Sequence, residues 1–375
     1  MPLGCVHVAQ RSVLDSRAGG KYSFTFWRVN IACAAVSRSG ETVPGLGRVA
    51  TREGARVSRR RTDVSGDVVE AGERSVRLAL AIPSYGSFFP RERLHEIVGL
   101  TRMAEDAGVD TVVVPDHLVM SDRTDRYRWG PFPLPVDAPW LEPLTVLAAI
   151  AGATRRVRLA TGILIAPLRP AALLAKAAAT LDVLSRGRLD LGVGTGWQKE
   201  EFDAVRLDYG RRGQLLDDAI AACRALWGKS PAHFDSETVR FEKIWCEPKP
   251  VQPGGIPVWF SGTLTPRTLD RVIRLGDGWI PIMGENRAGF AAGVAELRRG
   301  WTAAGRDPTR LRVRGMLEVV RDDRRRPHLA RTLAGAGELA ACGATEVQLP
   351  LLAFVRTPEH LPAFFDELRA AWGAT

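Results

Sequence analysis

The strongest constraint on the fold is a regular alternation of short apolar runs with longer stretches of helical period, which starts at Arg77. The first run, Arg77-Leu-Ala-Leu-Ala-Ile-Pro83, is typical of a buried strand. An apolar-periodic stretch from Leu94 to Ala107 then ends at Gly108 as a helix would, and a β-branched run, 111–114, follows. These pieces predict one βαβ unit.

The same alternation continues along the rest of the chain. We expect further strands at 158–165, 188–193, 256–260, 278–282, 311–320 and 345–351, and helices at 142–151, 171–184, 199–227, from 266, 288–301, 328–341 and 359–372. Strands joined by single helices run parallel with right-handed crossovers. An open doubly wound sheet would share this pattern, but eight units favour an α/β fold of the (β/α)8 TIM barrel type.

Two segments interrupt the alternation and are expected as insertions at the carboxyl ends of the strands. The first, 121–140, is rich in Pro and aromatic residues and is called the aromatic loop below. Its length favours a functional role over a passive connection. The second, 230–255, contains alternating apolar residues and several prolines, which predict a hairpin-like excursion.

Residues 1–75 differ from the remainder, so we predict two parts, 1–75 and a barrel domain, 76–375. The first part carries twelve Lys or Arg and seven Asp or Glu, about half of the net charge of +10, and shows no sustained helical or strand period. We interpret it as a disordered extension, or as residues translated from a start codon placed too far upstream. A basic arm that binds nucleic acid is the alternative.

Composition bounds the class of protein. An apolar fraction of 45% and a charged fraction of 25% allow a sizeable core. The five cysteines are scattered without metal-ligand spacing, which indicates reduced thiols in a cytoplasmic protein and no metal site. No apolar run approaches the roughly 20 residues that cross a bilayer, and the first residues lack the basic, apolar, small-residue order expected of a secretory signal. We therefore expect neither membrane nor nucleic acid as a partner.

The active site of a TIM barrel lies at the carboxyl ends of its strands, where Asp116 and His117 follow the second strand. An acid beside an imidazole can hydrogen-bond a ring or relay a proton near neutral pH. The alternative is structural, with Asp116 capping a turn and His117 packing against the aromatic loop. The adjacent residues alone leave both interpretations open.

Small residues follow three other strands and are candidates for cofactor binding. They are Gly162 and Ile163 after the third strand, Gly194, Thr195, Gly196 and Trp197 after the fourth, and Ser261, Gly262 and Thr263 after the fifth. Glycine lets the backbone approach a ligand, and helix starts offer N–H groups to a phosphate. Ordinary connecting turns, a strand bulge and a well-capped helix are the structural alternatives.

An ordered series of motifs resembles the luciferase-like monooxygenase superfamily, in particular its coenzyme F420-dependent oxidoreductases, from about Arg77 to Pro281. The motifs are Ala104-Glu-Asp-Ala-Gly-Val-Asp110, Asp116-His117-Leu118, Leu141-Glu-Pro-Leu144, Ala175-Lys176, Thr180-Leu-Asp-Val-Leu-Ser-Arg-Gly-Arg188, Leu191-Gly-Val-Gly-Thr-Gly-Trp197, Glu200-Glu-Phe202, Arg212-Gly213, Glu247-Pro-Lys-Pro250 and Leu275-Gly-Asp-Gly-Trp279. The chain departs from the usual pattern at Ser261, where paired glycines are common, and at Ile280, where a His often stands.

The resemblance implies a barrel whose cofactor ring lies over a kinked third strand that often carries a non-prolyl cis peptide, here at Gly162 and a neighbour. It implies that Asp116 and His117 face the ring and substrate, that the aromatic loop covers the substrate, and that the protein is a homodimer. The same resemblance places the phosphate-bearing tail of the cofactor among the small residues, namely Thr195, Gly196, Ser261, Gly262 and Thr263.

The function expected from this resemblance is hydride transfer between coenzyme F420 and a small organic substrate, with His117 giving or taking the proton and Asp116 orienting the ring or the imidazole. An FMN-dependent monooxygenase on the same barrel is the nearest alternative. A cofactor carrier without catalysis, or a nucleic-acid-associated protein that uses the basic segment 1–75, is the alternative of another class.

Overall fold

Nine parallel strands form a closed ring in the computed structural model, which describes residues 76–282 and 286–374. They are β1 (Arg77–Ala81), β2 (Thr111–Val114), β3 (Arg158–Thr161), β4 (Leu164–Ile165), β5 (Leu189–Gly194), β8 (Val258–Ser261), β9 (Gly278–Ile280), β10 (Arg312–Met316) and β11 (Glu346–Pro350). β1 pairs with both β2 and β11, which closes the ring. Because β3 and β4 are two halves of one bent strand that both pair with β5, the predicted eight-stranded barrel is confirmed.

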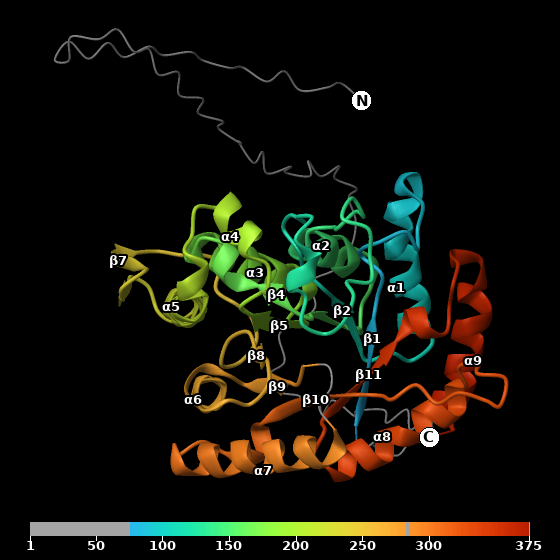
Figure 1. Ribbon diagram of the computed structural model, residues 1–375. Helices are drawn as coiled ribbons and strands as arrows, with labels where there is room; N and C mark the ends of the chain where they lie inside the picture. Colours follow the sequence, from blue (N-terminus) through green and yellow to red (C-terminus); the bar gives the residue numbers. More distant parts are fainter. Residues whose placement is uncertain (1–75, 283–285, 375) are drawn as a thin grey trace, which may run out of the picture. The chain divides into compact units, whose positions relative to one another are not determined.

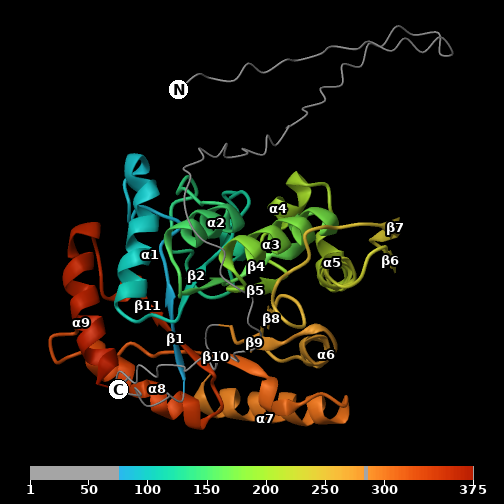
Figure 2. The same cartoon turned by 180° about the vertical axis from the view of Figure 1, so that it is seen from behind.

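Helices pack around the outside of the strands (Figures 1 and 2). They are α1 (Ile97–Asp106), α2 (Pro143–Ala153), α3 (Ala171–Ser185), α4 (Lys199–Ala204), α5 (Arg212–Trp227), α6 (Pro266–Leu275), α7 (Arg287–Ala303), α8 (Leu329–Ala341) and α9 (Leu361–Gly373). The prediction of one long helix over 199–227 is wrong, because α4 and α5 are separate helices. The chain leaves the helical conformation between them at Arg206, which has a φ of 59°.

Strand side chains alternate between the helix layer and the barrel interior. Leu78, Leu80 and most other large apolar residues of the strands belong to the main core under the helices. The interior instead contains the small cluster Ala79, Val113 and Ala160. These small side chains leave space inside the barrel, toward the carboxyl ends of the strands.

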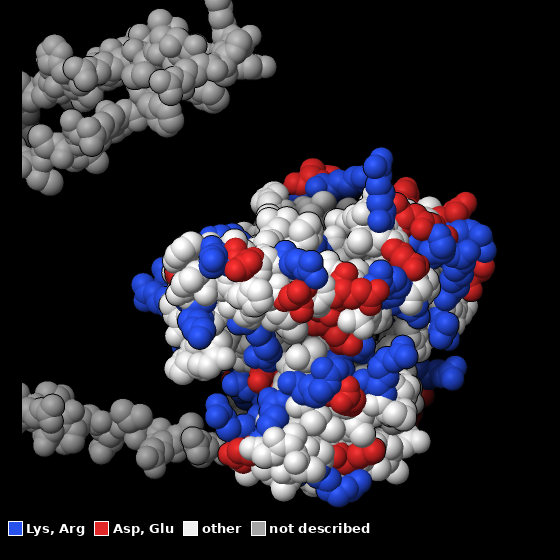
Figure 3. Space-filling model, turned by 90° about the vertical axis from the view of Figure 1, so that its left-hand side faces the viewer, with Lys and Arg blue, Asp and Glu red and all other residues white. Residues whose placement is uncertain are grey.

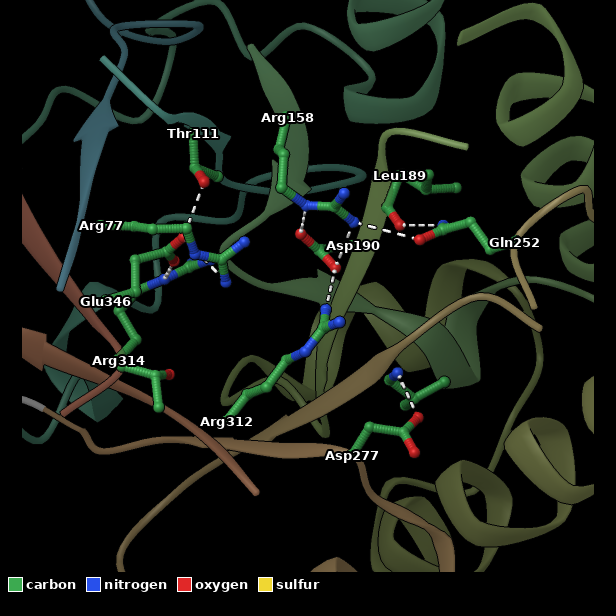
Figure 4. A network of polar contacts seen from close by, with 12 residues as sticks. Arg77, Thr111, Arg158, Leu189, Asp190, Gln252, Asp277, Arg312, Arg314 and Glu346 are labelled. Carbon is green, nitrogen blue, oxygen red and sulfur yellow. Dashed lines mark hydrogen bonds and ion pairs between the residues drawn. The ribbon is translucent and has the colours of Figure 1, made fainter. Parts of the chain in front are cut away.

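Charged residues fill the interior at the amino ends of the strands (Figure 4). Asp190 of β5 lies between Arg158 and Arg312, and Glu346 of β11 pairs with Arg314 at 2.6 Å. Asp190, Arg314 and Glu346 are each at most 1% exposed. The barrel is therefore closed by ion pairs at this end, and its ligand site must lie at the other.

The segments outside the regular alternation of strands and helices are described next to the predictions made for them. The excursion at 230–255 contains an antiparallel hairpin of β6 (Ala232–Asp235) and β7 (Arg240–Ile244), as predicted. The predictions for residues 1–75 lie outside the described residues. Within 76–282 and 286–374, no helix is both long enough and apolar enough to span a bilayer, and no group of His, Cys, Asp or Glu side chains is arranged to hold a metal ion.

Candidate active site

A cavity of about 470 Å³ opens at the carboxyl ends of the strands. Its lining includes both candidate catalytic residues and every candidate cofactor-binding residue except Thr263, which is an exposed residue. The three groups of small residues therefore come together with Asp116 and His117 in one site. The binding and catalytic roles assigned to these residues stay predictions.

The floor of the cavity contains the kink in the third strand. The peptide bond between Gly162 and Ile163 is cis, and it separates β3 from β4. A Cβ atom on Gly162 would overlap the side chain of Val113, so only glycine fits at this position. The kink exposes backbone to the cavity, where a flat ring would have room to lie.

The glycines of β5 have a packing role that the sequence pattern did not indicate. A Cβ on Gly192 would overlap the backbone oxygen of Thr161, and one on Gly194 would lie 2.9 Å from the side chain of Ile163. The next glycine in the series, Gly196, has a φ of 70°, and a Cβ on it would lie 2.9 Å from the side chain of Ile165. These glycines allow β5 to lie directly against the kinked strand, so their first function is to accommodate the kink.

The Asp116 carboxylate is held inside the protein by a guanidinium. Arg169 donates to its two oxygens at 2.7 and 3.0 Å, and the backbone N–H of Ile165 donates to it at 2.9 Å. Burial alone would lower the pKa of Arg169, but the hydrogen bonds and charges of Asp116 and Glu142 raise it. Asp116 thus ties the end of β2 to the segment after the kink, and its negative charge is neutralised by Arg169.

His117 is positioned by a buried glutamate. Its Nδ1 lies 3.1 Å from Oε2 of Glu201, whose other oxygen accepts the N–H of Leu118 at 2.8 Å. Glu201 is fully buried, whereas the His117 side chain is 10% exposed and lines the cavity. A carboxylate can only accept, so Nδ1 carries the proton toward Glu201 and Nε2 is the nitrogen left for a ligand. The expected contact of Asp116 with this imidazole is replaced by that of Glu201.

Aromatic side chains form the wall on the side of the cavity next to His117. Trp140 stacks on Tyr85 with ring centroids 4.6 Å apart and contacts the His117 ring edge-on at 4.6 Å. Burial, together with the neighbouring Tyr127, raises the pKa of the Tyr85 hydroxyl. The aromatic loop is anchored by Gln198, which receives the N–H of Ser121 and donates to the carbonyl of Val119.

Small polar residues lie on the opposite side, at β5 and β8. Gly262 has a φ of 145°, which favours glycine, and Ser261 and Thr195 are among the residues that line the cavity. Helix α6 begins just beyond them, where Thr265 accepts the N–H of Thr268 and Pro266 takes the first helical position. This side therefore offers hydroxyl groups and glycine backbone, the donors that suit a phosphate.

Sequence analysis did not identify three residues of the site, namely Glu201, Arg169 and Gln348. Glu201 lies in one of the motifs that carry the family resemblance, but nothing in that motif shows that it contacts His117. Arg169 precedes a proline at the start of α3, and Gln348 lies within β11. These residues are far along the chain from their partners or from the other lining residues, so no local sequence pattern indicates that they belong to the site.

The fold and site geometry agree with one protein family. The family model described as "Luciferase-like monooxygenase" matches residues 75–370. The chain belongs to the luciferase-like monooxygenase family. The family resemblance noted from the sequence is thereby confirmed.

Curated relatives and a solved structure are consistent with this membership. An uncharacterized protein of Mycobacterium tuberculosis is 37% identical over 210 residues, which cover 55% of this chain and 73% of that protein. The F420-dependent hydroxymycolic acid dehydrogenase of the same organism is 32% identical over 252 residues, 65% of each chain. The coenzyme F420-dependent tetrahydromethanopterin reductase of Methanopyrus kandleri shares the fold, with a TM-score of 0.58, 16% identity, and coverage of 80% of this chain and 97% of that one.

The cavity of this family member fits a deazaflavin or flavin. The glycine-lined kink gives a flat surface at the floor, and the hydroxyls of Thr195 and Ser261 stand at one side without a strong competing partner among the described residues. A tricyclic ring with a phosphate-bearing tail matches these two features together. Gly162 and Ile163 would contact the ring, and the β5 and β8 turns would hold the tail.

Proposed function

We propose that this protein is an oxidoreductase that uses coenzyme F420 for hydride transfer to or from a small organic substrate. The observation that carries the proposal is the placement of His117, whose Nδ1 is bound to Glu201, in the same cavity as the Gly162–Ile163 kink. A deazaflavin supplies two-electron hydride chemistry when bound. The protein then needs to orient the substrate, exclude water and move one proton.

The residues of this chain suit those tasks. His117 would exchange a proton with the substrate oxygen through Nε2, because its Nδ1 is directed to Glu201. Tyr85 and Trp140 would exclude water from the reacting atoms. Asp116 would act through the backbone, by holding the kinked segment in place together with Arg169.

The names of two similar proteins support the choice of F420 for this proposal. The relative with 32% identity is named as F420-dependent, and the reductase of the same fold is also F420-dependent. Figure 3 shows Lys and Arg side chains interspersed with Asp and Glu on one face of the molecule, whereas no Lys or Arg is among the described residues that line the cavity. Surface charge therefore does not distinguish the two cofactors. Because FMN is also an anion, an FMN-dependent monooxygenase is the second candidate.

A binding titration distinguishes these candidates. The purified full chain is titrated with F420 and with FMN, each oxidised and reduced, and cofactor fluorescence or absorbance is followed. Micromolar or tighter binding of F420 alone is the expected result. Preference for FMN would indicate the monooxygenase, and binding of neither would contradict both proposals and favour a function without this chemistry.

The remaining proposals concern the oligomeric state, the location and the partners of the protein. We retain the homodimer, a cytoplasmic location, and the absence of nucleic-acid and membrane partners as proposals. Sedimentation of the purified protein tests the dimer. A DNA titration at several salt concentrations tests for the weak, salt-sensitive binding that a basic segment would give.

A further inference from the structure

We infer that Arg314 determines the cofactor specificity of this site, because its buried guanidinium favours a negatively charged ring and hence the deazaflavin over FMN. This inference rests on the proposed function, since it takes the cofactor ring to lie over the kink at Gly162 and Ile163. Arg314 belongs to β10, and its side chain lies in the barrel interior (Figure 4).

One N–H group of this guanidinium lies directly beneath the cavity floor. A Cβ atom on Gly162 would lie 3.5 Å from Nη1 of Arg314, and Gly162 lines the cavity. The Arg314 side chain is buried, and among residues 76–282 and 286–374 its Nη1 has no hydrogen-bond partner. Buried N–H groups are normally paired, so an unpaired donor beside a cavity points to a ligand there.

The rest of the guanidinium is fixed by its neighbours. Its Nε donates to Oε1 of Glu346 at 2.6 Å, and the other oxygen of Glu346 accepts the hydroxyl of Thr111 at 2.6 Å. The buried ring of Trp259 has its centroid 5.1 Å from Cζ of Arg314. These contacts hold the charge in place before a ligand binds, so its effect on the ligand costs no rearrangement.

The ion pairs around Arg314 do not cancel its charge. Within the described part of the barrel interior, four guanidiniums share two buried carboxylates (Figure 4). The guanidiniums are those of Arg77, Arg158, Arg312 and Arg314, and the carboxylates are those of Asp190 and Glu346. The network has an excess of positive charge, and Arg314 is the member that reaches Gly162. Charges act strongly on one another in a buried environment, so a negative ring above the kink would be stabilised.

The two candidate cofactors differ in the charge of their oxidised rings. The ring hydroxyl of the deazaflavin in F420 is conjugated with the pyrimidinedione, which makes it acidic, and the ring is an anion near neutral pH. The oxidised ring of FMN has no such hydroxyl and is neutral. A fixed cation under the floor therefore favours the deazaflavin ring and gives the FMN ring no comparable gain.

The test compares two probes that share the deazaflavin ring and lack the phosphate-bearing tail, 8-hydroxy-5-deazariboflavin and 5-deazariboflavin. Each is titrated into the full chain at mildly alkaline pH, where the hydroxyl is ionised, and probe fluorescence is followed. We expect the hydroxylated, anionic probe to bind at least about tenfold more tightly. Equal affinities, or tighter binding of the neutral probe, would overturn the inference.

Variants of the ion pair separate the charge of Arg314 from its packing. The double variant Arg314→Met/Glu346→Gln leaves neither charge unpaired, and its preference for the anionic probe should fall to within about twofold of equal affinities. Glu346→Gln alone keeps the cation and should keep or increase the preference. Arg314→Lys also keeps the charge and should retain most of it. If the double variant preferred the anionic probe as strongly as the native chain does, Arg314 would have no role in the choice of cofactor.

The matched control is Arg312→Met, on the same strand. Arg312 is also paired with a buried carboxylate, that of Asp190, but its side chain is 36% exposed. Because solvent screens its charge, the preference between the two probes should change by less than about threefold. An equal loss in Arg312→Met and in the double variant would assign the effect to the whole network and overturn the specific role of Arg314.

The proposed function and this inference fail in different ways. If the native chain bound neither F420 nor FMN, both would be contradicted. If it bound F420 but gave equal affinities for the two probes, the proposed function would stand and the role of Arg314 would be overturned.

Discussion

The imidazole of His117 and the carboxylate of Glu201 form a buried pair, with Nδ1 and Oε2 3.1 Å apart. The two residues are 84 positions apart in the sequence, on the turn after β2 and on the short helix α4. The same carboxylate holds the N–H of Leu118, so it fixes the backbone as well as the ring. A buried acceptor on one side of an imidazole sets which nitrogen faces the ligand.

Glu201→Gln should therefore slow hydride transfer while leaving cofactor affinity within about twofold of the native value, because the glycine-rich side of the cavity is unchanged. We expect turnover to fall by about tenfold or more, since an amide can donate as well as accept and no longer fixes one tautomer. The measurement is the rate of change in F420 absorbance with a substrate found by screening small organic molecules, beside a cofactor titration.

The matched control for this variant is Glu200→Gln. Glu200 is the preceding residue, pairs with Arg126, and lies outside the cavity lining. Its substitution should change turnover by less than about twofold. If Glu201→Gln turned over at the native rate, or if both variants were equally impaired, Glu201 would have no specific positioning role.

The pair of Asp116 and Arg169 predicts strong coupling in a double-mutant cycle. Arg169→Met should lower the free energy of unfolding by about 3 kcal/mol, because it leaves the buried Asp116 carboxylate without its cationic partner. Asp116→Asn should lower it by less, because Arg169 keeps its ion pair with Glu142. The double variant should lose less than the sum of the two. Urea unfolding of all four proteins measures the cycle. A stable Asp116→Asn protein with normal cofactor binding and no turnover would instead indicate a direct catalytic role for Asp116.

The alternation of strands and helices could be predicted because each element carries its own local pattern of apolar residues. The contacts of the candidate site could not. Glu201 meets His117 across 84 positions of the chain, and Arg169 meets Asp116 across 53, and no local pattern of apolar residues specifies such contacts. The long helix expected over 199–227 failed because the chain turns at Arg206, which has a φ of 59°.

The glycines show a different limit of the sequence pattern. The series of Gly192, Gly194 and Gly196 suggested close approach to a ligand, and two of these glycines do line the cavity. Their spacing is nevertheless explained by the neighbouring kinked strand, whose Thr161, Ile163 and Ile165 meet them in turn. A packing reason of this kind appears only when the partner strand is known.

Gly192→Ala should accordingly destabilise the protein by about 3 kcal/mol or more, because the added Cβ would overlap the backbone oxygen of Thr161, which cannot move as a side chain can. Gly152→Ala is the matched control. Gly152 lies in α2, and a Cβ there meets no atom within 4 Å. It should be neutral or stabilising by about 0.5–1 kcal/mol. Equal unfolding midpoints for the two variants would contradict the packing role.

The proposed boundary near residue 75 also leads to a prediction. The family match begins at residue 75, and β1 begins at Arg77. A chain that starts at Glu70 should therefore unfold within about 2 °C of the full chain and bind F420 with the same affinity. Thermal unfolding and the cofactor titration test this. A large loss of stability would show that residues 1–69 contribute to the folded domain.

The ion pairs at the amino ends of the strands predict how stability depends on pH. Burial alone would raise the pKa of the Asp190 carboxyl, but the hydrogen bonds of Arg158 and the charges of Arg158 and Arg312 lower it. A carboxyl whose pKa is lowered by folding stabilises the protein fully above its unfolded pKa of about 3.9. That stabilisation is lost as the pH falls from the unfolded pKa through the lower pKa of Asp190 in the folded protein.

Asp190→Asn should thus be less stable than the native protein by about 3 kcal/mol at neutral pH, since Arg158 and Arg312 lose their buried partner (Figure 4). The difference should be constant above about pH 5 and shrink below about pH 4, as the native carboxyl becomes protonated. Urea unfolding at a series of pH values measures it. Asp203→Asn, which removes the exposed partner of Lys199, should change stability by less than about 0.5 kcal/mol at any of these pH values. A difference between Asp190→Asn and the native protein that did not vary with pH would show that folding leaves the pKa of Asp190 unchanged.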